Sequence, residues 1–96
     1  MKSGRSKEER GLERIRTLFS ALLYKNLEDR QGMLNTIDSE IESLRGILAN
    51  DKIEKYKKAW WEAEQIVSIS IFRGKTELSK IDEEEICGLV RKICDS

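Results

Sequence analysis

Histidine is absent from this 96-residue chain, and cysteine occurs only twice, as Cys87 and Cys94. Without imidazole, the chain has no Ser–His or Cys–His catalytic pair and no histidine ligand for zinc. Two thiols are too few for a tetrahedral metal site. Carboxylates and lysines are plentiful, but no spacing singles out a reacting pair. The sequence therefore predicts a protein that is not an enzyme and that holds no metal and no cofactor.

The two cysteines also bear on the cellular compartment. On a helix, residues seven apart share a face but lie about 10 Å apart along the axis. A disulfide needs Cα atoms within about 7 Å of each other, so Cys87 and Cys94 are predicted to be reduced, half-buried thiols. Reduced thiols are typical of the cell interior, and we expect a cytoplasmic protein.

Long hydrophobic runs are missing as well. No apolar stretch approaches the roughly 20 residues that span a bilayer, and the N-terminal residues are charged, unlike a secretory signal. We therefore expect no membrane among the partners. Proline is also absent, and only three Asn and two Gln accompany abundant Lys, Glu, Arg and Ile. Thermophilic proteins favour such a composition.

What the chain contains is enough for one small folded domain. Eighteen basic residues balance 18 acidic ones, and 39% of the residues are hydrophobic, which argues against disorder. Residues 1–6, with Lys2 and Arg5, are typical of a flexible basic arm. Residues 7–96 are predicted to form a single helical domain.

The apolar residues recur at helical spacing from the start of this domain. A first helix is expected to begin near Ser6 or Lys7 and to reach at least Arg30, with Leu12, Ile15, Phe19, Leu22 and Leu23 on one face. A heptad seam then follows, with one polar position, at Leu23, Leu27, Arg30, Leu34, Ile37, Ile41, Leu44 and Leu48. The seam predicts one long helix or two abutting ones, and leaves open whether Gly32 breaks it.

The second half of the chain predicts two further helices. A break is expected at residues 49–51, with Asn50 in a left-handed conformation and Asp51 capping the next helix. That helix would end at Gly74. Its final stretch, residues 66–72, is β-branched and could be a strand, but a buried helix end is favoured because a lone strand has no partner. The last helix would start at Asp82, or alternatively at Ser79.

The fold class that these segments predict is all-α. We expect a small helical hairpin or bundle with two or three long helices and a short C-terminal helix. The heptad seam and the apolar stretch 66–72 exceed what one short chain easily covers, so self-association or a protein partner is expected.

The tract around Trp60 and Trp61 is the most informative for function. Consecutive helical residues point about 100° apart, so Trp60 takes the apolar stripe and Trp61 projects from the flank, beside Lys57 and Lys58. An exposed Trp among lysines fits a protein-binding anchor or a platform for stacking nucleobases. The alternative is a Trp folded under a neighbouring helix, with lysine stems over it.

The function expected from these features is a non-enzymatic interaction module. It would be a small accessory subunit of a larger intracellular assembly, possible hosts including nucleic-acid-processing complexes, with Trp61, Phe72, Lys57 and Lys58 binding the partner. The alternative is a helical protein that binds nucleic acid directly, alone or as a dimer, with phosphate contacts from Lys2, Arg5, Lys52 and Lys55. Balanced net charge is not typical of a dedicated DNA-binding domain.

Overall fold

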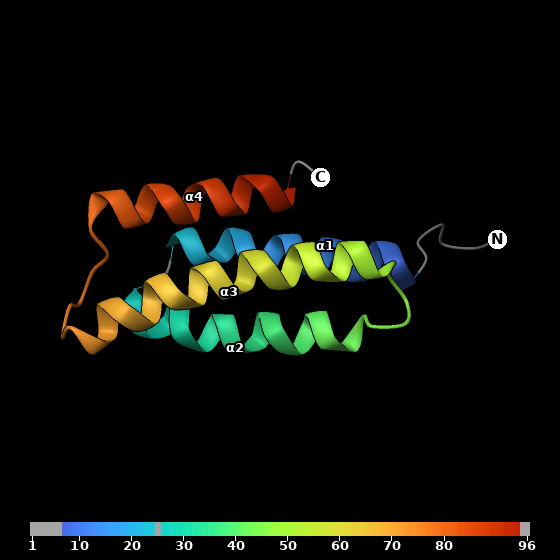
Figure 1. The fold of residues 1–96 in the computed structure, drawn as a ribbon, viewed down its shortest axis with the longest axis horizontal. Helices are drawn as coiled ribbons and strands as arrows, with labels where there is room; N and C mark the ends of the chain where they lie inside the picture. Colours follow the sequence, from blue (N-terminus) through green and yellow to red (C-terminus); the bar gives the residue numbers. More distant parts are fainter. Residues whose placement is uncertain (1–6, 25, 95–96) are drawn as a thin grey trace.

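Four antiparallel α-helices make up the computed structural model, which describes residues 7–24 and 26–94 (Figure 1). No strand occurs within these ranges, and the all-α prediction is confirmed. The helix at the C-terminus has 15 residues, as many as the first. The elements are α1 (Lys7–Ala21), a 3-10 turn (Leu22–Tyr24), α2 (Leu27–Ser43), α3 (Asn50–Phe72) and α4 (Lys80–Cys94).

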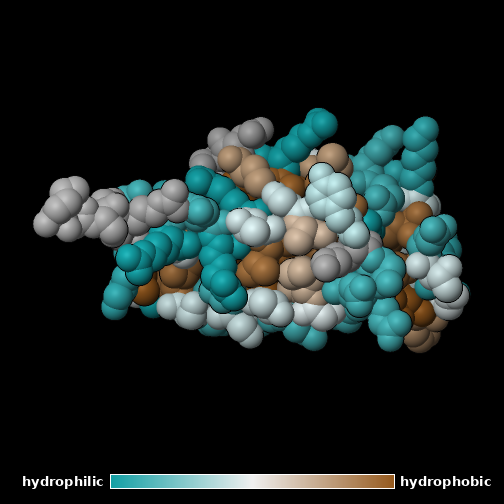
Figure 2. All heavy atoms as spheres, turned by 180° about the vertical axis from the view of Figure 1, so that it is seen from behind, coloured by the Kyte–Doolittle hydropathy of each residue, from teal (hydrophilic) through white to brown (hydrophobic). Residues whose placement is uncertain are grey.

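Each helix packs against two neighbours. In Figure 1 the helices alternate in direction, α1 and α3 running one way, α2 and α4 the other. The chief contacts are those of α2 with α1 and α3, and those of α4 with α1 and α3. One hydrophobic core fills the centre. On the face seen from behind, hydrophobic atoms are interspersed among hydrophilic ones (Figure 2).

The break between the first two helices lies earlier than the sequence predicted. The first helix ends at Ala21 and does not reach Arg30. The reason is Asn26, whose backbone is extended and whose side-chain Oδ1 accepts a hydrogen bond from the Asp29 backbone N–H at 2.8 Å. This N-cap starts a new helix, and Glu28 and Asp29 in its first turn suit the positive end of the helix dipole.

From Leu27 onward the heptad seam forms the buried face of α2 and the turn after it, whereas Leu23 lies in the 3-10 turn before α2 and is half-buried. Gly32 does not break the helix, since α2 runs through it from Leu27 to Ser43. Leu34, Ile37 and Ile41 are completely buried. The expectation that this seam exceeds what one chain can cover is therefore wrong, because the chain's own helices bury it.

Arg30, the polar position of the seam, is buried with 5% of its surface exposed. Its guanidinium forms an ion pair with Glu83 at the start of α4. A buried charge is tolerated only when it is paired, so the ion pair explains how an arginine fits into an apolar seam. It also ties α2 to α4, two helices on opposite corners of the bundle.

The turn from α2 to α3 differs from the one predicted. The left-handed residue is Gly46, with φ of +87°, and not Asn50, because the described residues include no non-glycine residue with positive φ. Asp51 does not cap α3 either. The helix begins at Asn50, with Ala49 in the extended N-cap position. A glycine takes the left-handed conformation without steric cost, which is why the turn forms there.

The apolar stretch 66–72 is helical, as favoured, because α3 continues to Phe72. Gly74, with φ of +75°, follows the helix end as predicted. The stretch is only partly buried: Val67 and Ser70 face the core, while Phe72 is 92% exposed. The prediction that this end of the helix is buried therefore holds for the side that faces the core and is wrong for the side that faces outward.

Two smaller expectations have a clear outcome. The start of α4 follows the alternative, since Ser79 Oγ accepts a hydrogen bond from the Asp82 backbone N–H at 3.2 Å and the helix begins at Lys80. Cys87 and Cys94 are both free thiols; Cys87 is half-buried as predicted, whereas Cys94 is exposed. Among the helices of the described ranges, none is long and apolar enough to cross a bilayer. The predicted arm, residues 1–6, lies outside the described residues.

Two glycines inside helices should respond oppositely to alanine. A Cβ at Gly32 would meet no described atom within 4 Å, so Gly32→Ala should stabilise the protein by about 1 kcal/mol through helix propensity. A Cβ at Gly11 would lie 2.3 Å from Cδ2 of the buried Leu44, so Gly11→Ala should destabilise it. Urea unfolding followed by circular dichroism measures both, and equal stabilisation by the two variants would contradict the close packing of α1 on α2.

Candidate functional site

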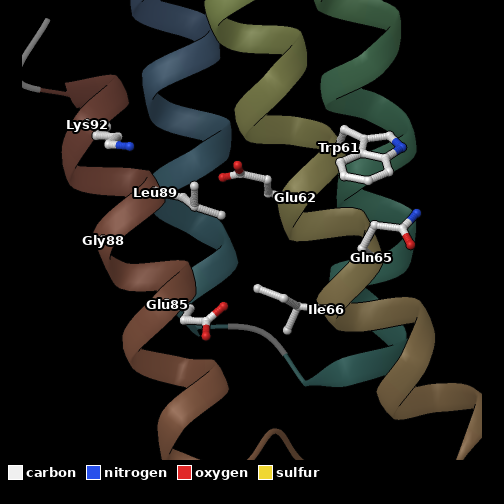
Figure 3. Close-up of a pocket in the computed structure, with 8 residues that line it drawn as sticks. All are labelled: Trp61, Glu62, Gln65, Ile66, Glu85, Gly88, Leu89 and Lys92. Carbon is white, nitrogen blue, oxygen red and sulfur yellow. The ribbon is translucent and has the colours of Figure 1, made fainter.

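A groove lies between α3 and α4. Its volume is about 640 Å³, and its lining residues are Trp61, Glu62, Gln65, Ile66, Glu85, Gly88, Leu89 and Lys92. Figure 3 shows Glu62 and Ile66 pointing from α3 toward α4, and Leu89 pointing back from α4. Trp61 and Gln65 lie on the outer side of α3. We call this feature the α3–α4 groove.

The groove continues toward the start of α3. A second hollow of about 320 Å³ shares Glu62, Leu89 and Lys92 with the first, and adds Lys55, Lys58, Ala59 and Ile93. Three ammonium groups, from two helices, therefore gather at this end. The groove has a basic end, near the C-terminus of α4, and an acidic residue, Glu85, near its other end.

An exposed ridge runs along α3 beside the groove. Trp61 is 56% exposed, Ile69 48% and Phe72 92%. Together with Lys58 and Gln65 they follow one another at steps of three or four residues, which places all five within a sector of about 80° around the helix. We call these five residues the α3 ridge. It combines three large apolar side chains that the described chain leaves uncovered.

The two adjacent tryptophans have different environments, as the sequence predicted. Trp60 is half-buried, and its indole N–H donates a hydrogen bond to the Leu34 carbonyl oxygen at 2.7 Å. That bond directs Trp60 toward α2. Trp61, about 100° further around the helix, points outward. With 56% of its surface exposed, Trp61 is not folded under a neighbouring helix and remains available at the surface.

Lys57 does not belong to the groove. Its ammonium forms ion pairs with Asp38 and with Glu42, the latter at 2.8 Å, and lies 5.1 Å from the centre of the Trp60 ring. It therefore joins α3 to α2. The hydrogen bond with Asp38, followed by that with Glu42, raises the pKa of the Lys57 ammonium.

Glu42 is the centre of this ion-pair cluster. Arg45 Nε donates to it at 2.7 Å, and Lys57 donates from α3. The hydrogen bond with Arg45, followed by that with Lys57, lowers the pKa of Glu42 from 4.5 to about 2. The same contact raises the pKa of Arg45. The cluster thus favours the ionised form of Glu42 in the folded state.

The other predicted residues are distributed as follows. Lys55 and Lys58 line the basic end of the groove. Phe72 lies at the far end of the α3 ridge, and Lys52 is exposed in the first turn of α3 but does not line the groove. Lys2 and Arg5 lie outside the described residues.

Sequence reasoning missed the α4 side of the groove. Glu85, Gly88 and Lys92 line it, although only the core face of α4 was assigned from its periodicity. The signal available was that these exposed positions share the helix face opposite Ile86 and Val90. That pattern shows which face is exposed, but not that α3 lies beside it.

Comparison with known proteins finds no matching family model, no matching curated protein and no matching solved structure. Within the described ranges, no group of three or more Cys, Asp or Glu side chains is placed to hold a metal ion.

Acid should weaken the α2–α3 contact. The pKa of Glu42 is lower folded than unfolded, so its stabilising contribution is present above pH 4.5 and is lost as the pH falls toward 2. Glu42→Gln should destabilise the protein at neutral pH and reduce the loss of stability in that pH window. Thermal unfolding of both proteins across the window measures this. Parallel pH profiles for variant and wild type would contradict the assignment.

Proposed function

We propose that the protein is a non-enzymatic interaction module, a small helical accessory subunit that acts by binding other polypeptides through the α3 ridge and the α3–α4 groove. The observation that carries this proposal is the alignment of Trp61, Ile69 and Phe72, all exposed, on one side of a well-packed helix.

Water contact with large apolar side chains forfeits the free energy that their burial would contribute, about 25 cal/mol per Å² of apolar surface. Single exposed hydrophobic residues are ordinary, whereas contiguous ones mark interaction sites. Trp is also enriched among residues that dominate binding energy. Trp61 and Phe72, the anchors expected from the sequence, support a protein-binding surface on α3.

The lining of the groove supports a binding role over catalysis. Its described lining residues include no serine, threonine or cysteine that could act as a nucleophile. The groove is instead apolar along Ile66 and Leu89, with the charged side chains of Glu62, Glu85 and Lys92 beside them. A partner helix with an apolar face could lie in such a groove.

Removing the aromatic anchors should abolish partner binding. A tagged protein is used to capture partners from extract of its native cell, with nuclease treatment and a high-salt wash. Trp61→Ala/Phe72→Ala should lose at least about 90% of any stoichiometric partner, because hot-spot truncations cost about 2 kcal/mol or more each. Tyr24→Ala is the matched control, since Tyr24 is an aromatic residue that is 85% exposed and belongs to the 3-10 turn instead of α3. Equal capture by all three proteins would contradict the proposal.

A second candidate function is nucleic-acid binding at the basic end of the groove. The observation that favours it is the convergence of Lys55 and Lys58 from α3 with Lys92 from α4. Phosphate groups could neutralise these ammonium groups while a base stacks on Trp61.

This second candidate predicts affinity for oligonucleotides that falls steeply with salt. Lys55→Glu/Lys58→Glu should weaken binding of a fluorescent single-stranded oligonucleotide by at least about tenfold and flatten its salt dependence. Lys7→Glu/Lys80→Glu removes as much charge from two helix starts outside the groove and should have a smaller effect. Fluorescence anisotropy at several salt concentrations decides, and binding that is insensitive to salt and to both variants would exclude the phosphate contacts.

A further inference from the structure

The α3 ridge is complementary to itself. Gln65 is at its centre: Trp61 and Ile69 each lie four residues away, and Lys58 and Phe72 each lie seven residues away. If two copies of α3 pack antiparallel across Gln65, the Trp61 ring meets the partner's Ile69, and the Lys58 ammonium meets the partner's Phe72 ring. The first pair buries apolar surface, and the second is a cation–π pair.

The outer face of α4 is also complementary to itself, through the charges of its side chains. Gly88 lies at the centre of this face. Glu84 and Lys92 each lie four residues away, and Glu85 and Arg91 each lie three residues away. An antiparallel pair of α4 helices centred on Gly88 therefore places each acid opposite a base. All five residues are exposed.

The two centres lie at the same level of the bundle. Gln65 and Gly88 both line the groove, and Figure 3 shows them at nearly the same height along α3 and α4, with the Gln65 side chain on the outer side of α3. Because α3 and α4 are antiparallel neighbours, one axis drawn through both residues runs across the helices (Figure 1). A two-fold rotation about that axis generates both antiparallel pairings at once.

We propose that a second copy of this chain occupies the outer face of α3 and α4, forming a two-fold symmetric dimer whose axis passes through Gln65 and Gly88. This inference rests on the proposed function, because it uses the same surface of α3 and α4 for binding. It goes beyond that function by naming a second copy of this chain as the molecule that binds there. In such an interface the same patch on both subunits must match itself, which is the property that the ridge and the outer face of α4 share.

Gln65 and Gly88, the two residues on the proposed axis, can each lie next to their own copy in the partner subunit. A residue on a two-fold axis meets its own copy, so it must tolerate that contact. The Gln65 side chain carries both a donor and an acceptor and can pair with itself. Gly88 has no side chain, and a Cβ built there meets no described atom within 4 Å, so two α4 backbones can approach closely.

Charge complementarity fits a second copy of this chain in the antiparallel arrangement. The acids of α4 gather in its first half and the bases in its last turn, so a parallel partner copy would juxtapose like charges. Only the antiparallel arrangement pairs opposite charges throughout, and that arrangement is the one that also places Trp61 against the partner's Ile69.

Charge reversal with restoration tests the α4 pairing. Sedimentation of the purified wild type should show a dimer. Glu84→Lys/Glu85→Lys should raise the dimer Kd by at least about tenfold, and Arg91→Glu/Lys92→Glu should do the same, because each places like charges opposite one another. An equimolar mixture of the two variants should restore the dimer, since every facing pair is then opposite in sign. Glu28→Lys/Asp29→Lys, in the first turn of α2, is the matched control and should dimerise like the wild type.

Restoration in the mixture separates loss of the interface from loss of folding, because neither chain changes on mixing. A wild type that stays monomeric at high micromolar concentration, or variants that dimerise as well as the wild type, would overturn the proposal. So would variants that keep the helical circular dichroism of the wild type yet fail to associate with each other on mixing.

Cross-linking tests the position of the axis. In a Cys87→Ser/Cys94→Ser background, Gln65→Cys should give a covalent dimer with a short bis-maleimide reagent. Glu54→Cys is the matched control on the same helix. Residue 54 is eleven residues from the axis, so its two copies in the dimer would lie about 33 Å apart and should not be cross-linked to each other. Efficient cross-linking at residue 54 with none at residue 65 would place the axis elsewhere and contradict the proposal.

The two proposals fail in different measurements. A monomeric wild type whose captured partner is lost in Trp61→Ala/Phe72→Ala contradicts the dimer and leaves the interaction module standing. The opposite result is a dimer that responds to charge reversal, together with other partners that Trp61→Ala/Phe72→Ala captures as well as the wild type does. That result contradicts the proposed use of the α3 ridge for binding those other partners.

Discussion

The packing of α2 against α3 is the constraint on which the rest of the structure depends. The apolar stripe of α2 requires cover along its whole length, and α3 provides most of it. The Trp60 indole bonded to Leu34 and the Lys57 ion pairs fix the rotation of α3 about its axis. Once that rotation is fixed, the 100° step of the helix turns Trp61 and Phe72 away from the core and into solvent. The surface that we propose as functional is thus a direct consequence of the core.

The fold class and most of the core could be predicted from periodicity alone, because burial of one helix face is a local pattern. The break after Ala21 could not be placed from that pattern, since apolar residues continue at helical spacing across it. The signal was Asn26 followed by two acids, which is a common helix start. Similarly, Asn50 and Gly46 are both residues that can end a helix, and their sequence does not decide which one takes positive φ.

The candidate site could be predicted only where it lies on one helix. Trp61, Lys55 and Lys58 follow from the periodicity of α3, whereas Gly88 and Lys92 join them because α4 packs alongside. Helix pairing depends on contacts between distant parts of the chain, for which a single sequence holds no local signal. The partner of Arg30 illustrates the limit: an arginine in an apolar seam indicates that a carboxylate is needed, but Glu83 is 53 residues away.

The alternating direction of the four helices has a consequence for how the chain folds. Most helix contacts join elements that follow one another directly, so most of the native structure can form without closing long loops. The pairing of α1 with α4 is the largest exception, and it brings together the two ends of the described chain. That pairing has the largest loop-closure entropy of the bundle. Once α2 and α3 have packed, the last helix to dock, whether α1 or α4, closes only its own short connection, so the α1–α4 contact costs the least entropy when it forms last.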